Sequence, residues 1–185
     1  MTVRLSAAAT PTAPALTLRP WRPDDAAALV VAHRDPGMRR WLVTHLDSED
    51  DARRWVDEQS EGWASRTRLG FAVLEGAGRP VGHVVVKVVE SSGGVAEVGY
   101  WTSAEVRGRG VAPRALDAVS AWALGGQGLL PLARLELFHA SGNLASCRVA
   151  EKSRYVLHSV LPAQPPHFRT EGHLHVRRSA VVRRY

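Results

Sequence analysis

The chain has 185 residues, of which 45% are hydrophobic and 23% are charged, and these values are ordinary for one soluble domain. Its single cysteine, Cys147, excludes an intramolecular disulfide, and no run of about 18 apolar residues predicts a membrane span. The net charge of +6 favours anionic partners such as nucleic acid, the ribosome or a phosphorylated cofactor, although a solvated basic surface is the simpler explanation.

Residues 1–14 are mostly Ala, Thr and Pro and lack the apolar core of a secretion signal. We interpret them as a disordered tail, followed by one domain over residues 15–180. The lone cysteine fits a reducing compartment, so we expect a cytoplasmic protein.

The first elements alternate between strand and helix patterns. Residues 16–18 alternate as a strand, and Asp24 or Asp25 can cap a helix that runs to about Arg34. The sequence at 35–37, Asp-Pro-Gly, should break it.

A second helix is predicted after Ser48, which is an N-cap with acidic support from Asp51. Its buried face should contain residues at helical spacing: Ala52, Trp55, Val56, Gln59 and Trp63.

Three strands should then follow at 70–74, 83–90 and 95–102. The short turns at 76–78 and 91–94 make them antiparallel neighbours.

The last third mixes both patterns. A helix with Val111, Ala115, Ala118, Val119 and Trp122 on its apolar face should end at the glycines 125–126. A strand at 134–138 and a helix from 143 to about 152 come next, and two closing strands, 155–160 and 173–176, flank a Pro-rich loop at 161–168. The pattern predicts an α/β (α+β) domain with an antiparallel meander and late helical crossovers.

The strongest chemical signal is the loop Arg107-Gly108-Arg109-Gly110-Val111-Ala112, placed between a strand and a helix. Glycines allow close backbone approach, and a helix N-terminus presents unpaired N–H groups to an anion. The loop is therefore a candidate pyrophosphate site, held mainly by backbone. It is neither a dinucleotide fingerprint nor a Walker A loop, because the third glycine and the Lys-Ser/Thr pair are missing.

These residues resemble the Gln/Arg-x-x-Gly-x-Gly/Ala signature of the GNAT acetyltransferase superfamily, with Arg107, Gly110 and Ala112 in the signature positions. The stretch 96–101 looks like the family's central strand. The resemblance implies a mixed, mostly antiparallel sheet flanked by helices, with a splayed cofactor-binding strand. It also implies that acetyl-CoA binds along the backbone at Trp101, Thr102 and Val106.

A second match lies downstream. Residues 143–152 are similar to the Asn-x-x-Ser…Ala-x-Lys helix of the ribosomal-protein N-terminal acetyltransferases, the RimJ/RimL type. Asn143 can cap the helix and still bond the cofactor amide, and Ser146 can lie near the thioester sulfur. The family continues with a glycine where this chain has Arg154, so a positive φ there would cost about 1 kcal/mol.

By this resemblance the amine attacks acetyl-CoA directly in a ternary complex. Ser146 is the candidate that protonates or solvates the leaving thiolate. Two candidates for the base are Glu97, acting through water, and His139, which titrates near neutrality. Cys147 is better explained as a packed helix residue than as a nucleophile.

No metal site is expected. His173 and His175 alternate on one strand face, but no third ligand is evident, and His158 and His167 are scattered.

The implied function is acetyl-CoA-dependent N-acetylation of a primary amine, with a protein N-terminus as the favoured acceptor. A polyamine, antibiotic or metabolite amine is the alternative acceptor. A non-catalytic acyl-CoA-binding module and, from charge alone, a nucleic-acid-binding protein are the other function classes. The expected partners are acetyl-CoA and the acceptor; ribosome association and a homodimer are compatible with the sequence, and no membrane is expected.

Overall fold

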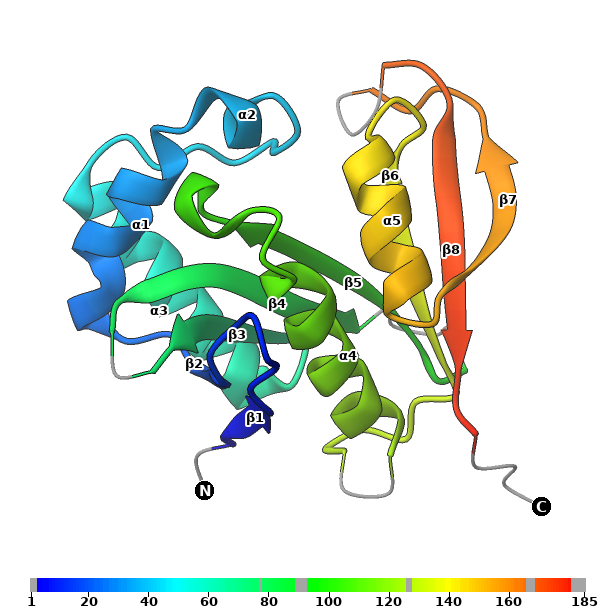
Figure 1. The fold of residues 1–185 in the computed structure, drawn as a ribbon, viewed down its shortest axis with the longest axis horizontal. Coiled ribbons are helices and arrows are strands. Elements are labelled where there is room, and N and C mark those ends of the chain that lie inside the picture. Colours follow the sequence, from blue (N-terminus) through cyan, green and yellow to red (C-terminus); the bar gives the residue numbers. More distant parts are fainter. Residues whose placement is uncertain (1–2, 77, 89–92, 126–127, 166–168, 181–185) are drawn as a thin grey trace.

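The protein is described here by a computed structural model, which defines all residues except 1–2, 77, 89–92, 126–127, 166–168 and 181–185. One eight-stranded sheet with the order β1-β2-β3-β4-β5-β6-β8-β7 forms its centre (Figure 1). The strands are β1 (Leu5–Ala7), β2 (Leu16–Pro20), β3 (Arg68–Glu75), β4 (Pro80–Val88), β5 (Val95–Thr102), β6 (Arg134–Ala140), β7 (Val156–Leu161) and β8 (Gly172–Arg178).

The predicted fold class is confirmed. Every neighbouring pair in the sheet is antiparallel except β5 and β6, which run parallel. The closing strand pair of the sequence analysis is also confirmed, but β8 inserts between β6 and β7 rather than adding at the edge. Parts of the predicted turns at 76–78, 91–94 and 125–126, and of the loop at 161–168, lie outside the described residues.

Five helices are described: α1 (Ala26–His33), α2 (Pro36–Arg39), α3 (Glu49–Ser65), α4 (Val111–Leu124) and α5 (Leu144–Lys152). Two short 3₁₀ turns, Pro23–Asp25 and Ala104–Val106, precede α1 and α4. The helix break expected at 35–37 is followed by the four-residue α2, because Asp35 caps it and Pro36 occupies its first position. Among the described residues, no helix combines the length and apolarity needed to cross a bilayer.

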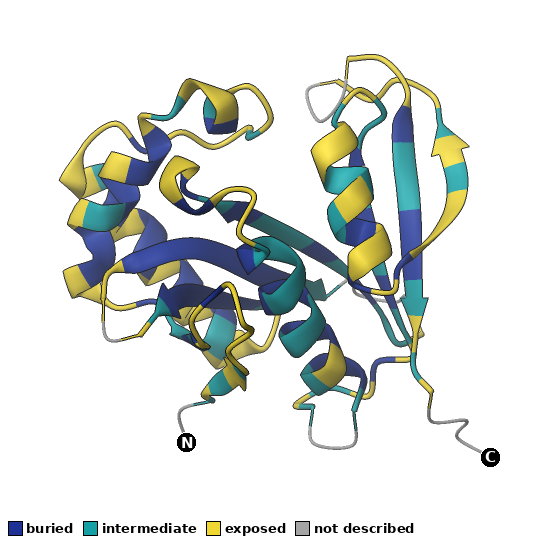
Figure 2. Cartoon of the chain, viewed as in Figure 1, coloured by how far each residue is buried: buried dark blue, intermediate teal, exposed yellow. Residues whose placement is uncertain are grey.

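Strand alternation divides the core into two layers. Phe71 and Val73 of β3 pack with α4, while Ala72 and Leu74 pack with α1 and α3 on the opposite face. Burial is therefore nearly continuous along β3 and β4, whereas β7 is largely exposed (Figure 2). Helices cover both faces of the sheet, so the middle of β5 lies between two helical layers.

The expected tail at residues 1–14 needs correction. Leu5–Ala7 forms β1, which pairs with β2, and Val3, Leu5 and Ala7 pack against the core. Arg114 of α4 donates hydrogen bonds to the backbone oxygens of Ala8 and Pro14, at 2.6 and 2.7 Å. Val3, Leu5 and Ala7 do alternate as in a strand. The alternation is too short to predict one in a segment otherwise rich in Ala, Thr and Pro.

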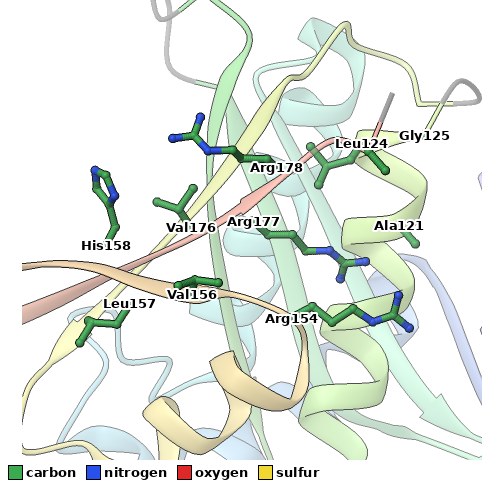
Figure 3. A pocket seen from close by; sticks show the side chains of 11 residues that line it. Ala121, Leu124, Gly125, Arg154, Val156, Leu157, His158, Val176, Arg177 and Arg178 are labelled. Carbon is green, nitrogen blue, oxygen red and sulfur yellow. The ribbon is translucent and has the colours of Figure 1, made fainter. Parts of the chain in front are cut away.

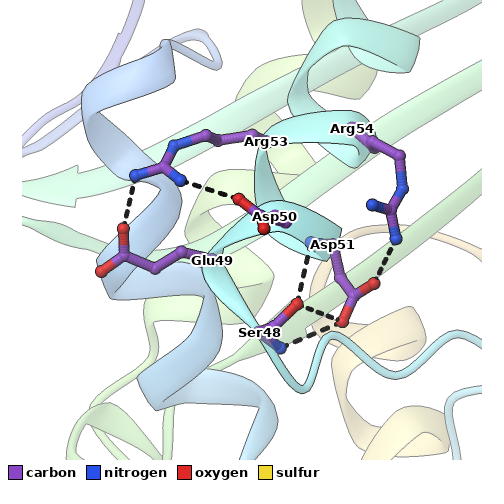
Figure 4. Close-up of polar contacts among 6 residues, drawn as sticks. All are labelled: Ser48, Glu49, Asp50, Asp51, Arg53 and Arg54. Atoms are coloured by element: carbon purple, nitrogen blue, oxygen red, sulfur yellow. Dashed lines mark hydrogen bonds and ion pairs between the residues drawn. The ribbon is translucent and has the colours of Figure 1, made fainter.

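The start of α3 is the best-predicted local feature. Ser48 Oγ accepts a hydrogen bond from Asp51 N, and Ser48 N donates to the Asp51 carboxylate (Figure 4). This reciprocal capping box satisfies two backbone donors at once. Arg53 adds ion pairs to Glu49 and Asp50, and the predicted face of α3 is buried at Ala52, Trp55, Val56 and Gln59, with Trp63 half-buried.

A buried aromatic cluster fixes β4 and β5 against α1 and α3. Trp21 Nε1 donates to His83 Nδ1 at 2.9 Å, and both rings pack near Trp101. The same Nδ1 atom lies 3.2 Å from the carbonyl oxygen of Phe71, which ties the imidazole to β3 as well. Burial lowers the pKa of His83 to about 3.

This cluster should make the protein sensitive to acid. Between pH 6.5 and about 3 the unfolded chain protonates His83 and the folded chain does not. The free energy of unfolding should therefore fall as pH falls through this window, by up to about 1.4 kcal/mol per pH unit from this group. The comparison is urea unfolding of wild type and His83→Asn at pH 7, 6, 5 and 4. Parallel pH profiles for the two proteins would contradict the assignment.

At the C-terminal end of α5, Arg154 has the positive φ that the glycine of the family suggested. Its φ is +64°, and the N–H groups of Arg154 and Tyr155 donate to the carbonyls of Glu151 and Ala150. This is a Schellman ending, in which glycine is the usual residue at the left-handed position. The helix therefore ends in an ordinary Schellman motif, with Arg154 in the position that glycine usually occupies.

We expect Arg154→Gly to be more stable than Arg154→Ala by about 1 kcal/mol. Both variants lose the same exposed side chain and its ion pair with Asp117, so they differ mainly in the left-handed backbone. Chemical unfolding of the two variants measures the difference. Equal stabilities would mean that the backbone at 154 carries no strain.

Candidate active site

The strands β5 and β6 diverge halfway along their length. Their pairing ends at Val98 and Leu137, although β5 continues to Thr102 and β6 to Ala140. On its other side β5 stays paired with β4 up to Thr102. The β6-facing edge of residues 99–102 is therefore outside the ladder, and its backbone groups can pair with an extended ligand.

The side chain of Trp101 does not face this edge, because it is buried in the aromatic cluster. The side chains of Val106 and Val111 are likewise buried in the core, while Ala112 is half-buried in the first turn of α4. These predicted cofactor residues therefore offer mainly their backbone.

The loop that follows β5 ends at the N-terminus of α4. Gly108 and Gly110 have φ values of +76° and +73°, and Gly110 is the residue that precedes the first turn of α4. Within the part of the chain that the structure describes, a Cβ built on Gly108 would meet no atom within 4 Å, and one on Gly110 would meet only Arg114, at 3.9 Å. The glycines are required here by backbone conformation, and they leave space in front of the N–H groups of α4.

The two arginines of the loop are paired within the protein. Arg107 forms an ion pair with Asp35, the cap of α2, and Arg109 forms one with Glu75 at 3.0 Å. Both hold the loop against other elements. Backbone N–H groups, rather than these guanidinium groups, are therefore the candidates to hold an anion.

Asn143 and Ser146 lie together at the N-terminus of α5. Asn143 Oδ1 accepts a hydrogen bond from Ser146 N at 3.2 Å and thereby caps the helix. Across the divergence, Tyr100 of β5 donates from its hydroxyl to Ser146 Oγ at 3.0 Å. Burial raises the pKa of Tyr100 to about 12, so the phenol stays protonated and Ser146 keeps its own hydrogen to donate.

Tyr100 was missed as a site residue. Its sequence signal was strand alternation: it lies two residues after Val98, on the face of β5 that packs with α4. Without knowing where β6 and α5 lie relative to β5, Tyr100 could not be distinguished from a core tyrosine.

Glu97 and His139, the two candidates for the base, lie on opposite faces of the sheet. Glu97 alternates with Val98 and Tyr100 and so lies on the opposite face of the sheet from Ser146. Its carboxylate is 2.5 Å from Lys87 Nζ on β4. His139 lies on the α5 side, with Nε2 at 3.7 Å from Cys147 Sγ.

A pocket of about 580 Å³ lies elsewhere, between the end of α4 and the strands β7 and β8. Figure 3 shows the guanidinium groups of Arg154 and Arg177 directed toward α4, with Arg178 directed away. The pocket contains none of the predicted site residues. The divergence of β5 and β6, which is a backbone feature, is the better candidate site.

The loop and edge fit an acyl-CoA. A pyrophosphate needs clustered N–H donors, which the first turn of α4 supplies beyond the two glycines. A pantetheine arm needs unpaired backbone groups, which the edge at 99–102 supplies.

Comparison with known proteins agrees with this geometry. The family model described as "Acetyltransferase (GNAT) domain" matches residues 15–156. No curated protein sequence matches the chain.

Several solved structures have a similar fold. Mycobacterium smegmatis RimJ in complex with CoA-disulfide has a TM-score of 0.80 at 18% identity, covering 99% of this chain and 89% of that one. A ribosomal-protein-S5-alanine acetyltransferase from Vibrio fischeri has a TM-score of 0.77 at 16% identity, covering 89% and 93%. The microcin C7 self-immunity acetyltransferase MccE, in complex with acetyl-CoA and AMP, has a TM-score of 0.76 at 15% identity, covering 91% and 97%.

Proposed function

This chain belongs to the GNAT family of acetyltransferases, and from that premise we propose that it transfers the acetyl group of acetyl-CoA to the α-amine of a protein N-terminus. The family makes it an acetyl-CoA-dependent acyltransferase. The finer assignment, an acceptor of the RimJ/RimL type, is supported by the Asn143-x-x-Ser146 helix and by the similarity of fold to RimJ.

The observation that carries the proposal is the hydrogen bond from Tyr100 to Ser146 across the open edge of β5. It places a hydroxyl donor at the point where the two strands separate. In the proposed reaction the amine attacks the thioester carbon and the carbon–sulfur bond breaks. Backbone N–H groups at 99–102 polarise the carbonyl. Ser146 donates its hydrogen bond to the leaving thiolate while Tyr100 donates to Ser146.

Glu97 is the proposed base. In this proposal the N-terminus of α4 and Ser146 hold the cofactor on one face of the sheet, and the acceptor approaches from the other face, where Glu97 lies. A carboxylate there takes the amine proton through a water molecule. Acid and base functions then act on opposite sides of the thioester.

The ion pair between Glu97 and Lys87 favours an α-amine as the acceptor. An α-amino group has a pKa of about 8 and a lysine about 10.4, so at pH 7 roughly a tenth of α-amines are already neutral. Glu97 is held by Lys87 at 2.5 Å, which leaves a carboxylate shared with an ammonium group. Such a site suits an acceptor that needs little help in losing its proton.

The proposal is tested with two peptides of the same sequence. One has a free α-amine and an acetylated lysine, and the other has an acetylated N-terminus and a free lysine. We expect CoA release, with mass-confirmed product, to be at least about 100-fold faster with the first peptide, in line with the difference in amine pKa.

Preference for the lysine peptide, or for a polyamine such as spermidine, would overturn the α-amine assignment in favour of the alternative acceptors. Binding of acetyl-CoA without CoA release from any amine would instead indicate a non-catalytic module. Each result identifies which part of the proposal fails.

A further inference from the structure

A second cluster of reactive side chains lies beside α5. The side chains of His139, Cys147, His173 and His175 each offer one ligand atom, and these four atoms all lie within 4.8 Å of one another. In the sequence, only the alternating pair on β8, His173 and His175, is recognisable. The other two ligands come from β6 and α5.

The fold explains the convergence. In the antiparallel register of β6 and β8, His139 is directly opposite His173, and Leu137 is opposite His175. Directly paired residues, and residues two apart on one strand, share a sheet face. All three imidazoles therefore face the same side, where α5 supplies the thiol of Cys147.

The hydrogen bonds leave the ligand atoms available. His139 Nδ1 lies 2.8 Å from the carbonyl oxygen of Ala140, so Nδ1 carries the proton and Nε2 has a free lone pair toward Cys147. A backbone carbonyl bonded to the second ring nitrogen is the usual support of a metal-bound histidine.

His175 supplies the independent observation. It is only 2% exposed, and neither ring nitrogen has a hydrogen-bond partner among the described residues. A buried imidazole without partners is costly unless something else binds it.

The two distances from Cys147 Sγ match those of a tetrahedral ion. Zinc bonds of about 2.0–2.1 Å to nitrogen and 2.3 Å to sulfur place those ligand atoms roughly 3.6 Å apart. Cys147 Sγ lies 3.3 Å from His173 Nδ1 and 3.7 Å from His139 Nε2. Imidazole nitrogen and thiolate sulfur are both donors that zinc binds in proteins.

We propose that His139, Cys147, His173 and His175 form a structural zinc site that fastens α5 to the strands β6 and β8. Four protein ligands leave no open position, as in structural rather than catalytic sites. Only Ala150 of α5 is fully buried, so the helix has little apolar anchorage of its own. The ion fixes the helix that carries Asn143 and Ser146. It also occupies His139 Nε2, which leaves Glu97 as the base.

The test uses the full-length protein, stripped with a chelator and titrated with Zn²⁺ or Co²⁺. We expect one zinc per chain after gel filtration, a rise in melting temperature, and with Co²⁺ a thiolate-to-metal charge-transfer band together with the visible bands of a tetrahedral ion. Cys147→Ala and His173→Ala should each weaken zinc binding by about 100-fold or more. His158→Ala, which removes an exposed histidine of β7 outside the cluster, should bind zinc as wild type does.

A stripped wild-type protein with a native circular dichroism spectrum that takes up no zinc would overturn the proposal. Undiminished stoichiometric zinc in both ligand variants would overturn it too. The Co²⁺ spectrum of wild type remains decisive even if a variant fails to fold. None of these readouts depends on acetyl transfer, so the result is independent of the proposed function.

Discussion

Gly110→Trp should lower the affinity for acetyl-CoA by at least about 100-fold, which corresponds to about 2.7 kcal/mol. Gly110 has a φ of +73° and directly precedes α4. A tryptophan there strains the left-handed backbone by roughly 1–2 kcal/mol, and its side chain enters the space in front of the helix N-terminus. The measurement is the dose-dependent rise in melting temperature with acetyl-CoA, which wild type should show and the variant should lose.

Gly93→Trp is the matched control. Gly93 also has a positive φ, +61°, and a Cβ there would meet no atom of the described residues within 4 Å. It precedes β5, whereas the loop follows β5, so the two glycines flank opposite ends of that strand. Gly93→Trp should keep the acetyl-CoA response while it carries a similar backbone penalty. Loss of the response in both variants would attribute the effect to folding and remove the loop as the cofactor site.

Glu97→Gln should lower kcat for an α-amine peptide by about 100-fold or more, the range for loss of a general base. The amide cannot accept the amine proton, so the reaction depends on amines that arrive neutral. The deficit should therefore narrow as the pH is raised from 7 toward about 9, past the α-amine pKa of about 8. Steady-state kinetics over this range, with CoA release as the readout, give the profile.

Glu136→Gln controls for the loss of a carboxylate. Glu136 is the register partner of Glu97 on β6 and therefore lies on the same sheet face, where it pairs with Arg134. Its removal should leave kcat close to that of wild type. A pH-independent deficit in Glu97→Gln, or equal deficits in the two variants, would mean that Glu97 supports the structure and does not take the proton.

The sequence by itself determined the elements whose signals are local. The capping pair Ser48 and Asp51 began α3, the glycines at 108 and 110 preceded α4, and Asn143 capped α5. These features depend on a few neighbouring residues and on backbone conformation, so they are readable without tertiary contacts. The same applies to Arg154, whose positive φ follows from the helix ending around it.

Only the tertiary structure decided which side chains meet. Tyr100 donates a hydrogen bond to Ser146, which is 46 residues away in the sequence. Glu97, only three residues before Tyr100, lies on the opposite face of the sheet from Ser146. The histidine–cysteine cluster depends on the insertion of β8 beside β6 and on the packing of α5 over both strands. Register and strand order are set by the burial of whole faces, a property of the folded chain that no single segment encodes.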